Sequence, residues 1–177
     1  LLALPHHFPA LILRGAAFPP SVQESRRFAT HPKLLQDLFS LAGESQARDF
    51  SDTVTYLISQ AMLADLCLFI SPPTEQDQLF IHTYYDLISE KNYPGAVLDS
   101  RSAPLIASAL RQGRPQRLPA SSTSPDLTNL AQALKLERTG NLLLVPVIST
   151  DGNTLFGIIL LSPYSNRDWL TEDQNLL

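Results

Sequence analysis

The residues best suited to catalysis or metal binding are few and scattered. The four histidines are His6, His7, His31 and His82, and three of them fall in the first 48 residues. His6 and His7 are adjacent, so on an extended segment they would point in opposite directions, which is poor geometry for a shared metal. The sequence has no GxSxG, HExxH, Walker loop or GxGxxG pattern. It therefore predicts no metal site and no enzyme.

Cys67 is the only cysteine, and it lies in the apolar run LCLFI. A cysteine in such a run usually behaves as a small buried hydrophobic residue, whose thiol is unreactive because burial raises its pKa. A single cysteine also excludes an internal disulfide and agrees with a reducing compartment. We therefore expect Cys67 to be buried and unmodified, and the protein to be cytoplasmic.

Composition narrows the class of partner. The chain has 177 residues, 13 Lys and Arg against 17 Asp and Glu, and a net charge of −4. A mildly acidic chain without a basic cluster is a poor candidate for binding nucleic acid. No apolar run reaches the ~18 residues of a membrane helix. The start is broken by Pro5 and Pro9 and lacks a basic leader, unlike a signal peptide. The chain begins without Met and stops in a predicted helix, so we expect a piece of a longer protein.

Residues 1–48 are predicted to form an arm and a helical connector. Pro5, Pro9, Pro19 and Pro20 exclude a long helix at the start. A later helix would place Leu34, Leu38 and Leu41 on one face. The main domain is predicted to span residues 49–177.

A β-hairpin over residues 141–161 is predicted at the centre of this domain. Two runs of apolar residues flank the turn TDGN, with Asp151-Gly152 at its middle. Both runs are almost continuously apolar, which indicates strands covered on two faces. Gly157 leaves room for something that presses on the sheet, either a helix or a ligand. Pro146 cannot donate a ladder hydrogen bond and is expected at a bulge or facing away from a neighbour.

The remaining elements follow from local patterns. Asp49 or Ser51 is expected to cap a first helix, and Ser102 and Ser124 are expected to cap two later helices. Strands are predicted at residues 66–70, 79–85 and 116–118. Strict alternation in the second strand would place Phe80, His82 and Tyr84 on one face. Residues 86–101 are read as a long connection. The fold class is α/β, an antiparallel sheet of five or six strands with helices on both faces.

Three stretches, in this order, resemble parts of a GAF domain, a small sensory module related to PAS domains. They are ASALRQGRPQRLPASSTSPDL, NLLLVPVISTDGNTLFGIILLS and WLTEDQNLL. They are similar to that family's helix, Gly and Pro-containing strand, to its paired central strands, and to the aromatic, acidic start of its last helix. The resemblance covers residues 49–177. It implies a non-catalytic sensory or regulatory input domain of a larger, bacterial-type signalling protein.

The resemblance also implies a small-molecule site between the sheet and the segments that cross it, at residues 86–139. The polar residues that could line this site are Tyr84, His82, Tyr93, Arg101 and Arg111. The alternative is that the tyrosines are half-buried packing residues and the arginines are solvated. No cofactor is specified. Covalent bilin binding is not expected, because residues 86–140 contain no cysteine.

Two further implications concern the end of the chain. Asn166-Arg167, Trp169 and Glu172-Asp173 are only similar to the pattern of cyclic-nucleotide-binding GAF domains, and a turn with a capped helix start is favoured. The terminal helices would pair in a homodimer and continue into adjacent signalling domains. A GAF-like dimerisation scaffold that has no ligand is therefore the alternative function.

Overall fold

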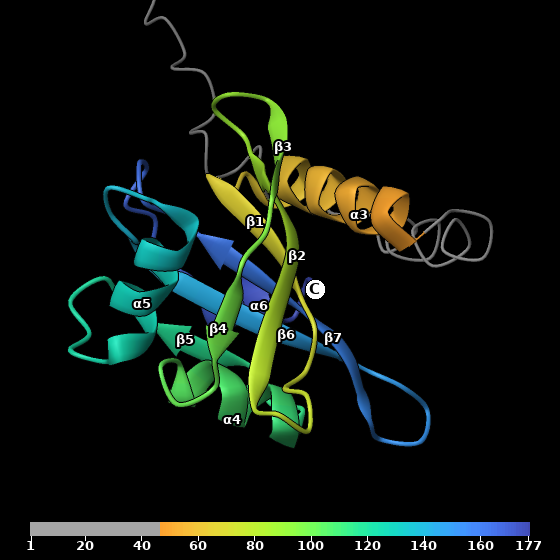
Figure 1. Ribbon diagram of the computed structural model, residues 1–177. Helices are drawn as coiled ribbons and strands as arrows, with labels where there is room; N and C mark the ends of the chain where they lie inside the picture. The colour runs from red at the N-terminus through yellow and green to blue at the C-terminus, as the bar shows by residue number, and fades with distance from the viewer. Residues whose placement is uncertain (1–46) are drawn as a thin grey trace, which may run out of the picture.

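The computed structural model describes residues 47–177 (Figure 1). The predicted arm and connector, including Leu34, Leu38 and Leu41, lie outside the described residues. The elements, in chain order, are α3 (Ala47–Met62), β1 (Leu66–Ile70), β2 (Gln78–Asp86), β3 (Lys91–Pro94), β4 (Val97–Asp99), α4 (Pro104–Gln112), β5 (Gln116–Leu118), α5 (Pro125–Leu134), β6 (Leu142–Ile148), β7 (Thr154–Leu161) and α6 (Thr171–Gln174).

One antiparallel sheet organises the domain. Its seven strands follow the order β3-β2-β1-β7-β6-β5, and β4 pairs with β2 beside β3. The sequence predicted five or six strands, fewer than the structure contains. The difference arises because residues 86–101, interpreted as a connection, contain the short strands β3 and β4. Strand β3 has four residues and β4 has three, too few for a detectable alternation of apolar and polar residues. The predicted α/β architecture with an antiparallel sheet is confirmed.

The predicted hairpin is present as β6 and β7, which lie inside the sheet. Gly152 takes a positive φ of 82° in the turn, a conformation that glycine adopts without steric cost. Ser149 and Asn153 close the turn through a hydrogen bond of 2.8 Å from the Ser149 amide to the Asn153 carbonyl. This pair of strands therefore forms the centre of the core.

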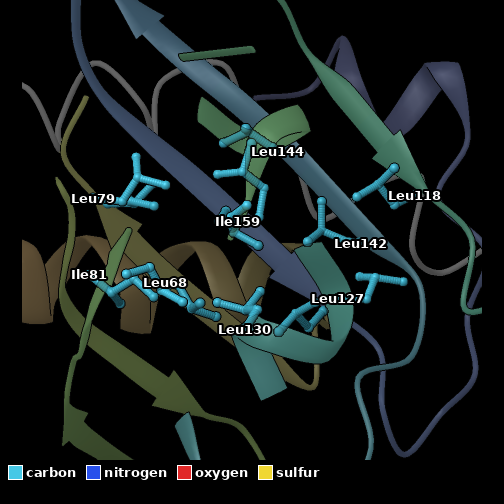
Figure 2. Packing of buried hydrophobic residues seen from close by; sticks show 14 of the residues in the cluster. Leu68, Leu79, Ile81, Leu118, Leu127, Leu130, Leu142, Leu144 and Ile159 are labelled. Atoms are coloured by element: carbon cyan, nitrogen blue, oxygen red, sulfur yellow. The ribbon is translucent and has the colours of Figure 1, made fainter. Parts of the chain in front are cut away.

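Two hydrophobic clusters cover the two faces of the sheet. Helices α4 and α5 pack on one face, where their leucines and isoleucines meet those of the strands (Figure 2). Helix α3 packs on the other face through Val54, Ile58 and Met62, together with Trp169. Alternate residues of β1 enter opposite clusters, with Leu68 facing α4 and α5 and Cys67 facing α3. Cys67 is fully buried, as predicted, and burial raises the pKa of its thiol.

The helix starts differ from the sequence expectation in two places. Asp49 and Ser51 lie inside α3, which already includes Ala47. Ala103, not Ser102, precedes α4, and no side chain at that position caps the helix. Instead, the buried carboxylate of Asp126 accepts a hydrogen bond of 2.8 Å from the Ile106 amide in the first turn of α4. The cap comes from α5, so a local sequence pattern could not identify it. Ser124 caps α5 as predicted, and Gly113 ends α4 in the left-handed conformation.

A helix packs where Gly157 leaves space on the sheet. A Cβ atom at this position would lie 2.6 Å from Leu110 of α4 and 2.9 Å from Leu144 of β6. The interpretation that a helix, not a ligand, presses on Gly157 is confirmed. Among residues 47–177, no helix is both long enough and apolar enough to cross a membrane.

Candidate functional site

A β-bulge in β2 separates two of the predicted site residues. Phe69 of β1 pairs with Thr83, but the next residue, Ile70, pairs with Ile81, so His82 is an extra residue in the ladder. An inserted residue reverses the alternation of side chains beyond it. The prediction that His82 and Tyr84 share one face is therefore wrong.

His82 lies on the α3 face of the sheet. Its ring meets the ring of Phe69 edge-on, with 5.7 Å between centroids, and its Nε2 lies 2.5 Å from the Ser71 hydroxyl. Phe69 belongs to the cluster beneath α3. His82 is thus remote from the face that the sequence assigned to the ligand, although the side chain itself is exposed.

Tyr84 lies on the opposite face and forms a stacked pair with Tyr93. The two residues are cross-strand partners in β2 and β3, with ring centroids 5.2 Å apart and planes inclined by 14°. Tyr84 also packs against the core under α5, and the Tyr93 hydroxyl donates to the Ser89 hydroxyl at 3.2 Å. Burial, followed by the neighbouring Tyr93 and Asp86, raises the pKa of Tyr84. Its hydroxyl therefore remains a donor at neutral pH.

A third tyrosine, Tyr164, comes from the far end of the chain and lies near enough to this pair for their charges to interact. The backbone amides of Tyr164 and Ser165 both donate to a carboxylate oxygen of Asp65 at 2.7 Å, which anchors the segment after β7. Burial raises the pKa of Tyr164, and the charges of Asp86, Asp65 and Glu137 add to the shift. We call Tyr84, Tyr93 and Tyr164 the tyrosine site. Sequence inspection missed Tyr164 because no local pattern marks it.

The two predicted arginines lie away from the tyrosine site, on the surface near α4. Arg111 pairs with Asp77, and about half of each side chain is exposed. Arg101 is exposed, and its amide donates to the carboxylate of Asp99 at 2.8 Å. Of the five predicted residues, the structure brings only Tyr84 and Tyr93 into contact.

A second location is an open groove at the β5 edge of the sheet, with a volume of about 520 Å³. Small-molecule pockets usually occupy ~300–1,000 Å³. We call it the edge groove. It is lined by Pro115, Gln116, Arg117, Leu118, Pro119, Asn141, Leu142, Asp168, Trp169 and Gln174. No local sequence pattern marks this region, because its lining comes from three separate segments.

Buried residues line the edge groove together with exposed charged ones. Leu118, Asn141, Leu142 and Trp169 are buried, whereas Arg117 is exposed. The Asn141 side chain accepts from the Ala120 amide at 2.7 Å, and the Trp169 indole donates to the Asn141 carbonyl at 3.1 Å. The groove therefore has a fixed, hydrogen-bonded base.

Solved structures that resemble this chain share one fold, although no sequence match identifies the chain. No family model and no curated protein match the sequence. Solved structures do match. One is the GAF domain of an Acinetobacter phosphoenolpyruvate-protein phosphotransferase, which is 13% identical in sequence. The superposition covers 90% of this chain and 87% of that domain, with a TM-score of 0.58. The chain has the GAF-domain fold.

Two other structurally similar proteins carry different chemistry. The phycocyanobilin-bound GAF domain of a cyanobacterial phytochrome is 8% identical, with 81% of this chain and 85% of that chain covered and a TM-score of 0.59. The free methionine-R-sulfoxide reductase from Neisseria meningitidis, solved in complex with its substrate, is 16% identical, with 92% and 87% covered and a TM-score of 0.59. The GAF fold alone therefore does not identify a ligand.

The C-terminal pattern that resembles cyclic-nucleotide-binding GAF domains has structural contacts here. Arg167 pairs with Asp173 at 2.5 Å, and its guanidinium lies 4.5 Å from the centre of the Trp169 ring. The other carboxylate oxygen of Asp173 accepts from the Leu170 amide at 2.8 Å, at the start of α6. These contacts support the expected turn and capped helix start.

The described part of the chain contains no group of three or more His, Cys, Asp or Glu side chains arranged to hold a metal ion. The tyrosine site and the edge groove are two candidate ligand sites in this part of the chain, and neither is built around a metal.

Proposed function

We propose that this chain is a non-catalytic sensory or regulatory input domain of a larger signalling protein, which binds a small molecule between the sheet and residues 86–139. The GAF fold supports the proposal, since its neighbours include a bilin-bound phytochrome domain and a domain of a phosphotransferase. Covalent attachment of such a chromophore is not part of the proposal, because residues 86–140 lack cysteine.

The stacked pair of Tyr84 and Tyr93 is the observation that carries the ligand proposal. Aromatic rings attract flat or apolar ligands through stacking, and the hydroxyls can orient polar groups. Tyr84 is half-buried against the core, so one side of the pair is held in place. Tyr164, which is exposed, lies near this pair. His82, Arg101 and Arg111 lie outside this surface and are not part of the proposed binding site.

The enzymatic alternative is weaker. A reduction that used a protein thiol would need an accessible cysteine. Cys67 is the only cysteine of the chain, it is fully buried, and burial raises the pKa of its thiol. A buried thiol with a raised pKa is a poor nucleophile. These facts support a non-catalytic role.

A dimerisation scaffold without a ligand is the second candidate function. The centre of the sheet face under α4 and α5 is filled by fully buried leucines and isoleucines, so a ligand there would have to displace them (Figure 2). Leu170 and Leu176, next to the short C-terminal helix, are exposed by 56% and 41%. Exposed apolar residues at the end of the domain would favour a homodimer through this region.

Native mass spectrometry of the purified chain tests the ligand proposal. We expect a co-purified small molecule that is lost in Tyr84→Ala and Tyr93→Ala. Tyr56→Ala is the matched control, because Tyr56 is also a tyrosine in a ring contact, but it meets Tyr85 edge-on on the α3 side. An unliganded wild-type chain that sediments as a dimer would favour the scaffold. A ligand retained in both tyrosine-site variants would place binding elsewhere.

A further inference from the structure

The edge groove carries one positive and one negative side chain that do not neutralise each other. Arg117 and Asp168 both line it. Among residues 47–177, the ion pairs are Arg111 with Asp77 and Arg167 with Asp173, so neither groove charge has an ionic partner there. Both side chains are exposed, so each charge is open to solvent and to a ligand.

Neutral groups hold each charge in position. The Arg117 guanidinium donates to the Trp169 carbonyl at 3.4 Å, which leaves most of its donors unused. The Asn141 side-chain amide donates to a carboxylate oxygen of Asp168 at 2.9 Å and to the Arg167 carbonyl at 3.0 Å. Asn141 is itself buried and bonded to the segment after β5. Both charges are thus oriented by the protein but remain available to a ligand.

The charge pair discriminates between classes of ligand. An anion would gain from Arg117 but would be repelled by Asp168, and a cation would meet the reverse situation. A neutral ligand would leave both charges partly desolvated without compensation. A ligand with a carboxylate and an ammonium group can satisfy both side chains at once. The half-buried amides of Gln116 and Gln174 offer further hydrogen bonds for such a ligand.

We propose that the edge groove binds a small zwitterion, a free α-amino acid or a dipeptide, with its carboxylate on Arg117 and its ammonium group on Asp168. Leu118, Leu142 and Trp169 also line the groove, with their side chains packed in the core behind its surface. The groove volume of about 520 Å³ admits either kind of molecule. This site lies at the β5 edge and does not depend on the tyrosine site.

Isothermal titration calorimetry with the 177-residue chain tests the proposal, and Trp169 fluorescence gives an independent signal from inside the groove. The probes are L-leucine, L-glutamine and L-leucyl-L-leucine. Two analogues of leucine carry one charge each, 3-methylbutylamine and 4-methylpentanoate. We expect at least one zwitterion to bind with a dissociation constant in the millimolar range or below. Both analogues should bind at least about tenfold more weakly, because each loses a charge-assisted contact. The relative affinities of leucine and dileucine distinguish an amino acid from a dipeptide.

Three variants locate the site. Arg117→Gln and Asp168→Asn should each weaken zwitterion binding about tenfold or more. Arg114→Gln is the matched control, because Arg114 is exposed and close in sequence but does not line the groove. Tyr84→Ala should leave binding unchanged, which separates this site from the proposed tyrosine site. The proposal is overturned if no zwitterion binds, if a one-charge analogue binds equally well, or if both groove variants bind like wild type. Unfolding midpoints of Arg117→Gln and Asp168→Asn close to wild type confirm that a loss is local.

Discussion

Substitution of Gly157 tests how tightly α4 presses on the sheet. In Gly157→Ala, the new Cβ atom would lie 2.6 Å from a methyl group of Leu110, 2.9 Å from one of Leu144 and 3.1 Å from one of Ile70. All three neighbours are fully buried. Buried side chains have little room to move in a core packed at the density of a crystal. The added methyl group must therefore force α4 or β6 to shift.

The expected cost follows from two opposing effects. Overpacking a core by one methyl group costs about 1–3 kcal/mol. Replacement of glycine by alanine restricts the unfolded chain and returns about 0.4–1 kcal/mol. We expect a net loss of about 1–2 kcal/mol in the free energy of unfolding. The assay is urea unfolding at 25 °C, followed by the fluorescence of Trp169, which is the only tryptophan and is buried.

A double-mutant cycle with Leu110→Ala identifies the cause. Leu110→Ala alone should cost about 2–5 kcal/mol, because it leaves a cavity in the core. The methyl group of Gly157→Ala would occupy part of that cavity, so the double variant should be at least as stable as Leu110→Ala. The coupling should be about 1 kcal/mol or more in favour of the pair. Leu130→Ala is the control, since Leu130 is fully buried on α5 but is not a nearest neighbour of Gly157. Additive losses with Leu110→Ala, or a neutral Gly157→Ala, would refute the contact.

Four other substitutions test buried positions. Asp126→Asn should lower stability by about 1–3 kcal/mol, because the charge that caps α4 is lost, and Glu137→Gln, at an exposed position, should change it little. Leu144→Ala and Ile158→Ala should each cost about 2–5 kcal/mol in denaturant melts, and losses below ~1 kcal/mol for both would contradict two-sided burial of the hairpin. Native Cys67 should resist thiol reagents. Because its pKa is raised in the folded state, stability should fall as pH rises above the usual thiol value of 9.0, by about 1.4 kcal/mol per pH unit. Cys67→Ala should lack this slope.

The candidate site was only partly accessible to sequence reasoning. Tyr84 and Tyr93 were selected as wall residues, and the structure stacks them because β2 and β3 pair in the corresponding register. His82 was grouped with Tyr84 through strict alternation, and the bulge places it on the other face. The bulge lies opposite Gly95, where a Cβ atom would come within 1.8 Å of the Ile81 carbonyl oxygen. This backbone contact links β2 to the segment that follows β3, so the order of apolar and polar residues within either segment does not reveal it.

Local patterns determined the elements of this protein. The apolar runs on both sides of Asp151-Gly152 specify the hairpin, and Ser124 followed by proline specifies the start of α5, because turns and caps depend on neighbouring residues. Tertiary structure alone decided which distant groups meet. The packed chain places Tyr164 near Tyr84, and it brings Arg117 and Asp168 to one groove. The physical reason is that burial of two sheet faces fixes the strand order only when the whole chain packs, whereas hydrogen bonds and side-chain periodicity act over a few residues.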